Sequence, residues 1–181
     1  MRKTVLLPVL IGSIVFVGCI SAAQRSQWNA RRGEELLEAG KYKRAVRRLE
    51  AAERARAGDA KLMFLLGSTY LYLGRYREAA ERLEKVIETE PKNYEAWFRL
   101  GNACLNMDKF DLAAAAYRMA IEVKPDFLEA VEALAMLYPD GGVTREEALA
   151  MWKRAFELET RDEWITRAEH YIEKLKNEGN D

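Results

Sequence analysis

Side chains that commonly do chemistry in enzymes are scarce in this sequence. It has two cysteines, Cys19 and Cys104, and one histidine, His170, too few for a zinc site built from Cys and His ligands. The Gly-rich phosphate loop and the G-x-S-x-G motif of serine hydrolases are both missing from it. The many carboxylates have Lys and Arg neighbours at the spacing of exposed helix faces. These features predict a protein that is not an enzyme and that takes no metal or cofactor.

One of the cysteines lies in a segment whose composition predicts export. The chain starts with the basic residues Arg2 and Lys3, continues with an uncharged, mostly apolar run from Thr4 to Val17, and then has small residues around Cys19. This order is the layout of a secretory signal. We therefore expect residues 1–23 to lie outside the folded domain.

The residues Phe16-Val17-Gly18-Cys19 resemble the lipobox of bacterial lipoproteins. The resemblance implies that Cys19 is diacylated and becomes the new N-terminus, although Phe16 stands where Leu is usual. Two alternatives remain open. One is cleavage after Ala23, where the sequence imitates the A-x-A pattern. The other is an uncleaved anchor over Thr4–Ala23, whose 20 residues are just long enough to span a membrane.

We accordingly expect a membrane-anchored lipoprotein of the bacterial cell envelope that faces the periplasm or the exterior. In the lipoproteins that this segment resembles, Asp directly after the lipidated Cys favours retention at the inner membrane. The residue in that place here is Ile20. The outer membrane is therefore favoured if the cell has one.

The overall charge gives no drive toward nucleic acid. The sequence has 29 basic and 29 acidic residues, and removal of residues 1–18 would take away Arg2 and Lys3 and leave the mature chain slightly acidic. A basic cluster early in the mature chain is interleaved with glutamates. We interpret it mainly as solvated helix surface, with a phosphate or lipid-headgroup patch as the alternative. Its members are Arg25, Arg31, Arg32, Lys41, Lys43, Arg44, Arg47 and Arg48.

The elements that would position these residues are helices. Ala, Leu, Glu, Arg and Lys dominate, and Pro is rare, so we predict an all-α protein. The helices also repeat, because several residues recur after 34 positions. The matched pairs are Gly67 and Gly101, Tyr76 and Phe110, Ala79 and Ala113, Val86 and Ala120, and Pro91 and Pro125.

The repeated motif resembles that of the tetratricopeptide repeat (TPR) family. Trp97-x-x-Leu100-Gly101-x-x-Cys104 matches the first-helix pattern W-x-x-L-G-x-x-Y, and Ala113-x-x-x-Tyr117-x-x-Ala120 matches the second-helix pattern A-x-x-x-F-x-x-A. The resemblance implies a right-handed superhelical stack of about four helical hairpins with a capping helix at its end. We expect one TPR domain over residues 24–181. Its repeats are predicted at about 26–59, 60–93, 94–127 and 128–160, and its capping helix at about 162–177.

The family also implies where a partner would bind, because the first helix of each repeat lines the concave side of the stack. The candidate groove residues of the two central repeats are Phe64, Ser68, Tyr72, Phe98, Arg99, Asn102 and Asn106. In the first repeat the equivalent places hold Gln27, Ala30, Arg31 and Glu34, and in the fourth they include Met136, Pro139 and Asp140. Aromatic and Arg anchors beside amide groups suit an extended peptide or a helix of a partner protein.

Two alternatives stay open at this stage. Phe64 and Phe98 would be structural if they pack against a neighbouring repeat instead of facing a ligand. The function that we expect is a protein–protein interaction scaffold that assists assembly of an envelope complex. The alternative is a periplasmic binding protein for a small molecule or a glycan strand.

Overall fold

The computed structural model of the chain describes residues 21–158 and 162–177. Cys19 and the other residues of the segment 1–20 lie outside these described residues. Over the described ranges the chain forms nine α-helices and no strand. They are α1 (Ala22–Glu38), α2 (Tyr42–Glu53), α3 (Ala60–Tyr72), α4 (Tyr76–Thr89), α5 (Tyr94–Leu105), α6 (Phe110–Val123), α7 (Leu128–Ala135), α8 (Arg145–Leu158) and α9 (Asp162–Asn177).

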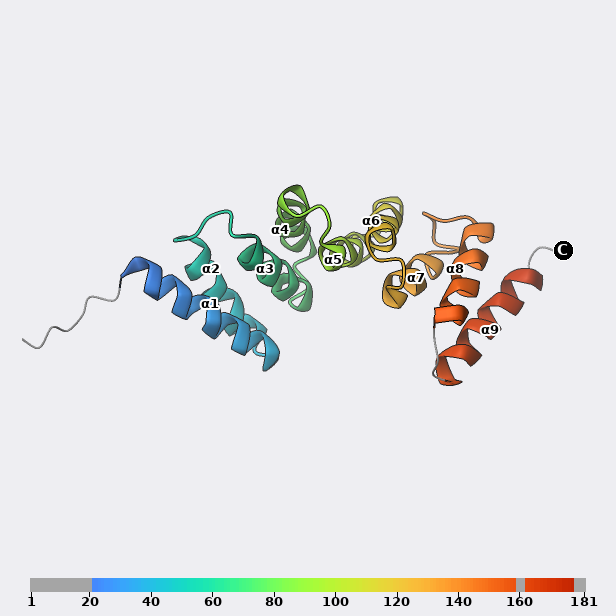
Figure 1. Cartoon of the computed structure of the whole chain (residues 1–181), viewed down its shortest axis with the longest axis horizontal. Coiled ribbons are helices and arrows are strands. Elements are labelled where there is room, and N and C mark those ends of the chain that lie inside the picture. Colours follow the sequence, from blue (N-terminus) through green and yellow to red (C-terminus); the bar gives the residue numbers. More distant parts are fainter. Residues whose placement is uncertain (1–20, 159–161, 178–181) are drawn as a thin grey trace, which may run out of the picture.

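Consecutive helices pair into hairpins, and consecutive hairpins pack on one another to form a curved stack (Figure 1). Helices α4 and α6 lie on the outer side of the curve, while α5 and α7 lie on its inner side. First helices also touch directly, because α1 contacts α3 and α3 contacts α5. The predicted all-α stack of helical hairpins is thereby confirmed.

Local signals in the sequence explain where several helices begin. The Ser21 hydroxyl accepts a hydrogen bond from the Gln24 amide, and the Gln24 side chain accepts one from the Ser21 amide, which together make a capping box. Asp59 caps α3 and Asn93 caps α5. In each case the side-chain oxygen accepts one hydrogen bond from a backbone amide in the first turn of the helix. The Thr144 hydroxyl accepts a hydrogen bond from the Glu147 amide at 3.2 Å and so caps the start of α8.

The repeated glycine lies at the crossing of the two helices in each of the first three hairpins. A Cβ atom at Gly67 would lie 2.8 Å from Leu83 Cγ, and one at Gly101 would lie 2.6 Å from Tyr117 Cδ1. These distances are too short for real Cβ contacts, so a larger residue would force the facing side chain or its helix to shift. Leu83 and Tyr117 are fully buried and each contributes roughly 1.5–3 kcal/mol by leaving water.

The fourth hairpin departs from the sequence prediction. Helix α7 ends at Ala135, so Pro139 and Asp140 lie in the turn before α8 and not on a groove-lining helix. Gly141 and Gly142 in this turn have φ values of 119° and 84°, which favour glycine. Ala79 and Ala113 are 34 residues apart, whereas the next equivalent alanine, Ala148, follows after 35, and this turn accommodates the extra residue.

Candidate partner-binding groove

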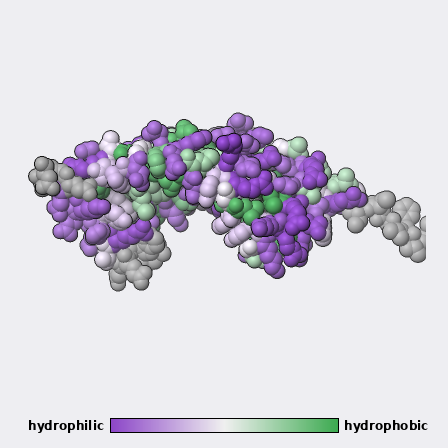
Figure 2. Space-filling model, turned by 180° about the vertical axis from the view of Figure 1, so that it is seen from behind, coloured by the Kyte–Doolittle hydropathy of each residue, from purple (hydrophilic) through white to green (hydrophobic). Residues whose placement is uncertain are grey.

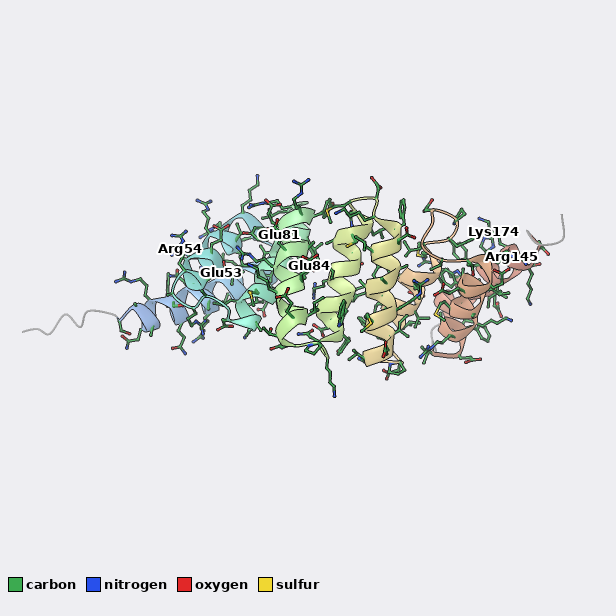
Figure 3. The ribbon with its side chains drawn as sticks, turned by 90° about the horizontal axis from the view of Figure 1, so that it is seen from above. Glu53, Arg54, Glu81, Glu84, Arg145 and Lys174 are labelled. Carbon is green, nitrogen blue, oxygen red and sulfur yellow. The ribbon has the colours of Figure 1, made fainter. Side chains whose placement is uncertain are left out.

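The inner side of the curve is the surface that the family pattern assigns to a partner. Figure 2 shows the stack from behind, with a hollow along its lower edge and hydrophobic surface beside this hollow on an otherwise mostly hydrophilic exterior. The outer side, seen in Figure 3, has mixed charge, with Glu53 and Arg54 at the end of α2 and Glu81 and Glu84 on α4. The two sides therefore differ in polarity, and the inner side offers a partner more apolar surface.

Phe64 of α3 and Arg99 of α5 meet across the boundary between the two central repeats. The Arg99 guanidinium carbon lies 5.1 Å from the centre of the Phe64 ring, a cation–π arrangement. Both side chains are half-buried. No hydrogen bond or ion pair joins the Arg99 guanidinium to another described residue, and its Nε is buried without an acceptor. Arg99 is therefore a half-buried cation whose Nε donor has no acceptor among the described residues.

Phe98 is held by other aromatic rings. Its centroid lies 5.7 Å from that of Tyr117 and 5.1 Å from that of Phe127, the latter pair being edge-to-face. Phe127 also makes an edge-to-face pair with Tyr94, and the Lys124 Nζ lies 4.6 Å from the Tyr94 ring centre. Phe98 is thus half-buried within an aromatic cluster at the boundary with α7, and it contributes to packing as well as to the surface.

Asn102 lies one turn beyond Arg99 on the same side of α5. Its Oδ1 accepts a hydrogen bond of 2.7 Å from the Tyr117 hydroxyl, and this bond orients the amide. The amide NH₂ group has no partner among the described residues. Burial raises the pKa of Tyr117 well above its ordinary value, so the phenol stays a donor at physiological pH. The bond therefore leaves the Asn102 NH₂ as a second unused donor near Arg99.

The remaining candidates are placed differently. The Ser68 side chain is buried and its hydroxyl donates to the Phe64 carbonyl at 2.8 Å, so it serves its own helix. The Asn106 amide donates to the Asn102 carbonyl at 2.8 Å, and its side chain is exposed. Tyr72 lies two turns beyond Phe64, is 57% exposed, and stacks on Tyr42 with centroids 4.6 Å apart. The structure therefore brings Phe64, Arg99 and Asn102 together and leaves Tyr72 apart.

A hollow of about 260 Å³ extends the inner surface toward the N-terminal end. Lys61 of α3 closes one side of it through an ion pair of 3.0 Å with Glu34 of α1. Its lining includes the four first-repeat residues expected there. The full lining is Gln27, Ala30, Arg31, Glu34, Arg56, Asp59, Lys61, Leu62 and Leu65.

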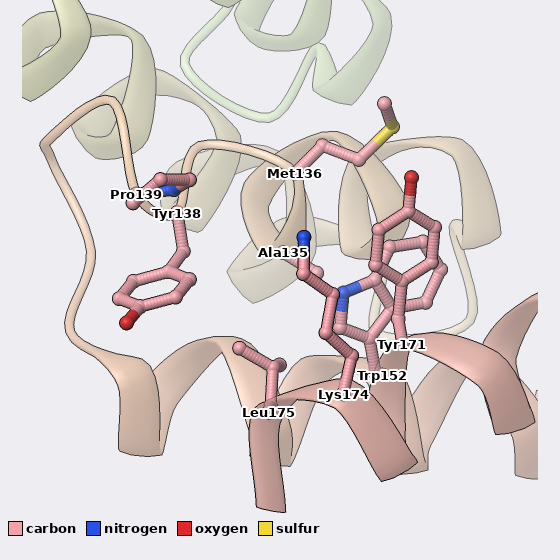
Figure 4. A pocket seen from close by; sticks show the side chains of 8 residues that line it. All are labelled: Ala135, Met136, Tyr138, Pro139, Trp152, Tyr171, Lys174 and Leu175. Atoms are coloured by element: carbon pink, nitrogen blue, oxygen red, sulfur yellow. The ribbon is translucent and has the colours of Figure 1, made fainter. Parts of the chain in front are cut away.

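A second hollow lies at the other end of the stack, between α7, α8 and α9 (Figure 4). It measures about 220 Å³. Its floor is the stacked pair of Trp152 and Tyr171, whose centroids are 4.5 Å apart. Lys174 extends from α9 along this hollow toward Ala135. The sequence pattern had not indicated this site, because it forms where the capping helix meets the last hairpin.

The part of the chain that the structure describes has neither a metal-ion cluster nor a membrane-spanning helix. Within it, no three His, Cys, Asp or Glu side chains gather in a way that would hold a metal ion. None of the helices described is both long enough and apolar enough to cross a membrane. Cys104 is buried, and its burial raises the pKa of its thiol.

The fold and its inner surface define a class of protein, a curved stack of helical hairpins that contacts other proteins. The sequence matches the family model for the tetratricopeptide repeat over residues 31–71 and 64–139. Because these residues make up more than half of the chain, it belongs to the tetratricopeptide repeat family. Its fold is that of a protein–protein interaction scaffold, and proteins of this family are generally not enzymes.

Solved structures agree with this assignment. A MamA protein superimposes with a TM-score of 0.75 at 21% identity, covering 85% of this chain and 82% of that one. MamA from MSR-1 is 31% identical over 74% of this chain and 76% of its own, with a TM-score of 0.67. The TPR domain of Arabidopsis OM64 gives a TM-score of 0.62 at 21% identity, covering 65% of this chain and 98% of that domain. No curated protein gave a significant match.

Proposed function

We propose that this protein is a membrane-anchored scaffold of the bacterial cell envelope that holds an extended or helical segment of a partner protein against α3 and α5. The observation that carries the groove is the Arg99 guanidinium, which is held over the Phe64 ring at 5.1 Å and lacks an acceptor among the described residues. Its partner would be a segment that supplies carbonyl or carboxylate oxygens beside apolar side chains.

A partner segment would relieve the free-energy cost of a buried donor that lacks an acceptor. A buried donor without an acceptor costs about 1–3 kcal/mol, and a partner's oxygen at Arg99 would recover this free energy. The Asn102 NH₂ group, one turn further along α5, offers a second donor to the same segment. Phe64, Leu65 and Leu105 are half-buried beside them and provide apolar contact. Arg and aromatic anchors of this kind dominate many protein interfaces.

The proposed location rests on the N-terminal segment. Its basic start, its apolar run and Cys19 have the order of a lipoprotein signal. Cys19 lies two residues before Ser21, the cap of α1, so a lipid on it would hold the stack close to the membrane. In this arrangement the scaffold faces the periplasm or the exterior, and it assists assembly of an envelope complex.

The test begins with site-specific crosslinking in cells. A photoreactive residue in place of Asn106, which is exposed near the groove, should capture a partner that the same residue in place of Glu157, exposed on α8, does not capture. The affinity of the purified partner is then measured for Arg99→Gln. We expect at least about tenfold weaker binding with little change in melting temperature, since a tenfold loss is about 1.4 kcal/mol.

The matched control is Arg77→Gln on the exposed side of α4, which should bind as the wild type does. The double variant Phe64→Ala and Phe98→Ala should also lose binding, and a lower melting temperature is expected as well because Phe98 packs on Tyr117 and Phe127. Full affinity in Arg99→Gln would show that partners use another surface.

A further inference from the structure

The first hairpin carries a concentration of exposed arginines, which we name the arginine face. Four arginines and Leu36 line a hollow of about 410 Å³ between α1 and α2, and no carboxylate is among its lining residues. The four are Arg32, Arg44, Arg47 and Arg48, and all are exposed.

Part of this face, at Arg32, lies where another hairpin would pack in the middle of the stack. Arg32 corresponds to Leu66 and Leu100 in the next two repeats, and both of these leucines are buried. Arg48 corresponds to Arg82 in the next repeat and to Ala116, which is buried, in the repeat after that. No hairpin precedes α1 among the described residues, so Arg32 is exposed at a place that is buried and apolar in the next two repeats.

The charges of the arginine face are only partly compensated. Arg32 pairs with Glu35 at 2.8 Å, and this carboxylate is shared with Arg31. Arg48 donates to the neutral Asn29 amide oxygen at 3.3 Å. Arg47 donates to the Lys43 backbone carbonyl at 3.2 Å, and the structure gives the Arg44 side chain no acceptor. One carboxylate therefore serves the whole face.

An exposed tryptophan adjoins these arginines. Trp28 is 55% exposed, and the Arg48 guanidinium carbon lies 4.8 Å from its ring. Arg25, Trp28 and Arg32 are spaced by three and four residues along α1, so they share one side of the helix. Tryptophan is enriched where proteins meet the headgroup layer of a membrane, because its ring is apolar and its N–H is polar.

The opposite end of the stack differs in charge. Helix α9 mixes Arg167, Glu169, Glu173 and Lys176 along its length. At the same end, Arg145, labelled with Lys174 in Figure 3, donates to the Leu175 carbonyl at 3.0 Å. A polar cap on a helical stack needs no particular sign of charge. The excess of positive charge on the arginine face therefore suits an anionic neighbour.

We propose that the arginine face lies against the anionic phospholipid headgroups of the membrane that carries the N-terminus. This inference rests on the proposed anchoring, because Cys19 lies two residues before the cap of α1. At 1.5 Å per residue, Trp28 is about 10 Å along the helix from its start, about one Debye length at physiological salt. The same contact would fix the direction in which the groove opens.

The test uses the full chain, isolated in detergent and reconstituted into vesicles with brominated acyl chains, which quench nearby tryptophan. Vesicles of phosphatidylcholine alone are compared with vesicles in which phosphatidylglycerol replaces part of it. The difference between the wild type and Trp28→Phe isolates Trp28 from the other three tryptophans. We expect strong quenching of Trp28 only with phosphatidylglycerol, and its loss at high salt.

Charge reversal shows whether the arginines cause this contact. Arg44→Glu with Arg47→Glu should reduce the quenching to its level in phosphatidylcholine, with an unchanged melting temperature because neither side chain pairs with an acid. The matched control, Lys85→Glu with Lys153→Glu at exposed places on α4 and α8, should quench as the wild type does. Equal quenching in both kinds of vesicle, quenching in neither, or wild-type quenching in the arginine variant would overturn the proposal.

Flotation of the same samples separates this outcome from a failure of anchoring. A chain that floats with both kinds of vesicle is anchored, whatever its Trp28 signal. If it floats but the quenching does not depend on anionic lipid, the arginine face has another role while the proposed anchoring stands. If it does not float with phosphatidylcholine, the anchoring and the headgroup contact that rests on it are both rejected.

Discussion

At the scale of single residues, Tyr70 connects the first hairpin to the second. Its hydroxyl donates to Glu50 Oε1 at 2.9 Å, and the Arg75 guanidinium carbon lies 4.5 Å from its ring. Burial raises the pKa of Tyr70 to about 12, and the bond to the Glu50 carboxylate adds to this increase. The bond exists only while the phenol keeps its proton, so this contact between hairpins depends on pH.

The direction of this pH dependence follows from the pKa of Tyr70 in the folded and in the unfolded chain. Because the ordinary pKa of Tyr is about 10, the unfolded chain loses this proton at a lower pH than the folded chain does. The stabilisation is complete below about pH 10 and is lost as the pH rises to about 12. Urea unfolding across this interval should show a larger loss of unfolding free energy for the wild type than for Tyr70→Phe, by at most about 2–3 kcal/mol.

The exposed tyrosine provides the control for this measurement. Tyr72→Phe should lose stability with pH as the wild type does. If Tyr70→Phe also follows the wild-type curve, the phenol does not hold its proton more tightly in the folded state.

The candidate groove residues could be predicted from the sequence, but the side chains that they contact could not. Phe64 and Phe98 are equivalent by the 34-residue period, yet one is covered by Arg99 and the other by Tyr117 and Phe127. These contacts join residues from different repeats, and helical periodicity within one repeat carries no information on them. The unused donors of Arg99 become visible only once all neighbouring acceptors are placed.

At the scale of elements, the period predicted the helices well because each repeat uses the same packing. The residues that follow the first helices recur with the 34-residue period. They are Gly40, Gly74 and Asp108, and all three have positive φ values, of 68°, 71° and 57°. Asp108 takes a conformation that glycine has in the other two turns, which Asp tolerates better than most residues. The turn before α8 has no counterpart in the other repeats, and so the groove assignments of Pro139 and Asp140 failed there.

The helix crossing within the third hairpin gives a prediction at this scale. Gly101→Leu should lower the unfolding free energy by about 1–3 kcal/mol, because the new side chain would occupy the space of the buried Tyr117 ring. The shift of Tyr117 would also break its hydrogen bond to Asn102. Thermal and urea unfolding measure the loss.

Ala115→Leu adds the same side chain at an exposed place on α6 and should leave stability nearly unchanged. A Gly101→Leu protein as stable as this control would mean that α5 and α6 separate without cost at their crossing.

At the scale of the whole molecule, the stack separates two surfaces along its length. The proposed partner groove lies on the inner side of α3 and α5, while the arginine face lies at the end next to the N-terminal segment. A scaffold anchored at that end would hold the groove away from the bilayer and open to partners. This arrangement makes the mode of anchoring decisive for how the protein presents its groove.

Cys19→Ala tests that mode in cells. If Cys19 is lipidated, the wild type incorporates a labelled fatty acid, and the variant should lose the label and accumulate as an unprocessed precursor. Cys104→Ala is the matched control, because Cys104 is buried in the third repeat and should not affect labelling.

Unlabelled wild type that stays in carbonate-washed membranes would instead favour the uncleaved apolar anchor. Release of the wild type into the soluble fraction would favour cleavage after Ala23. Either result would rule out the lipoprotein signal while leaving the groove to be tested through Arg99.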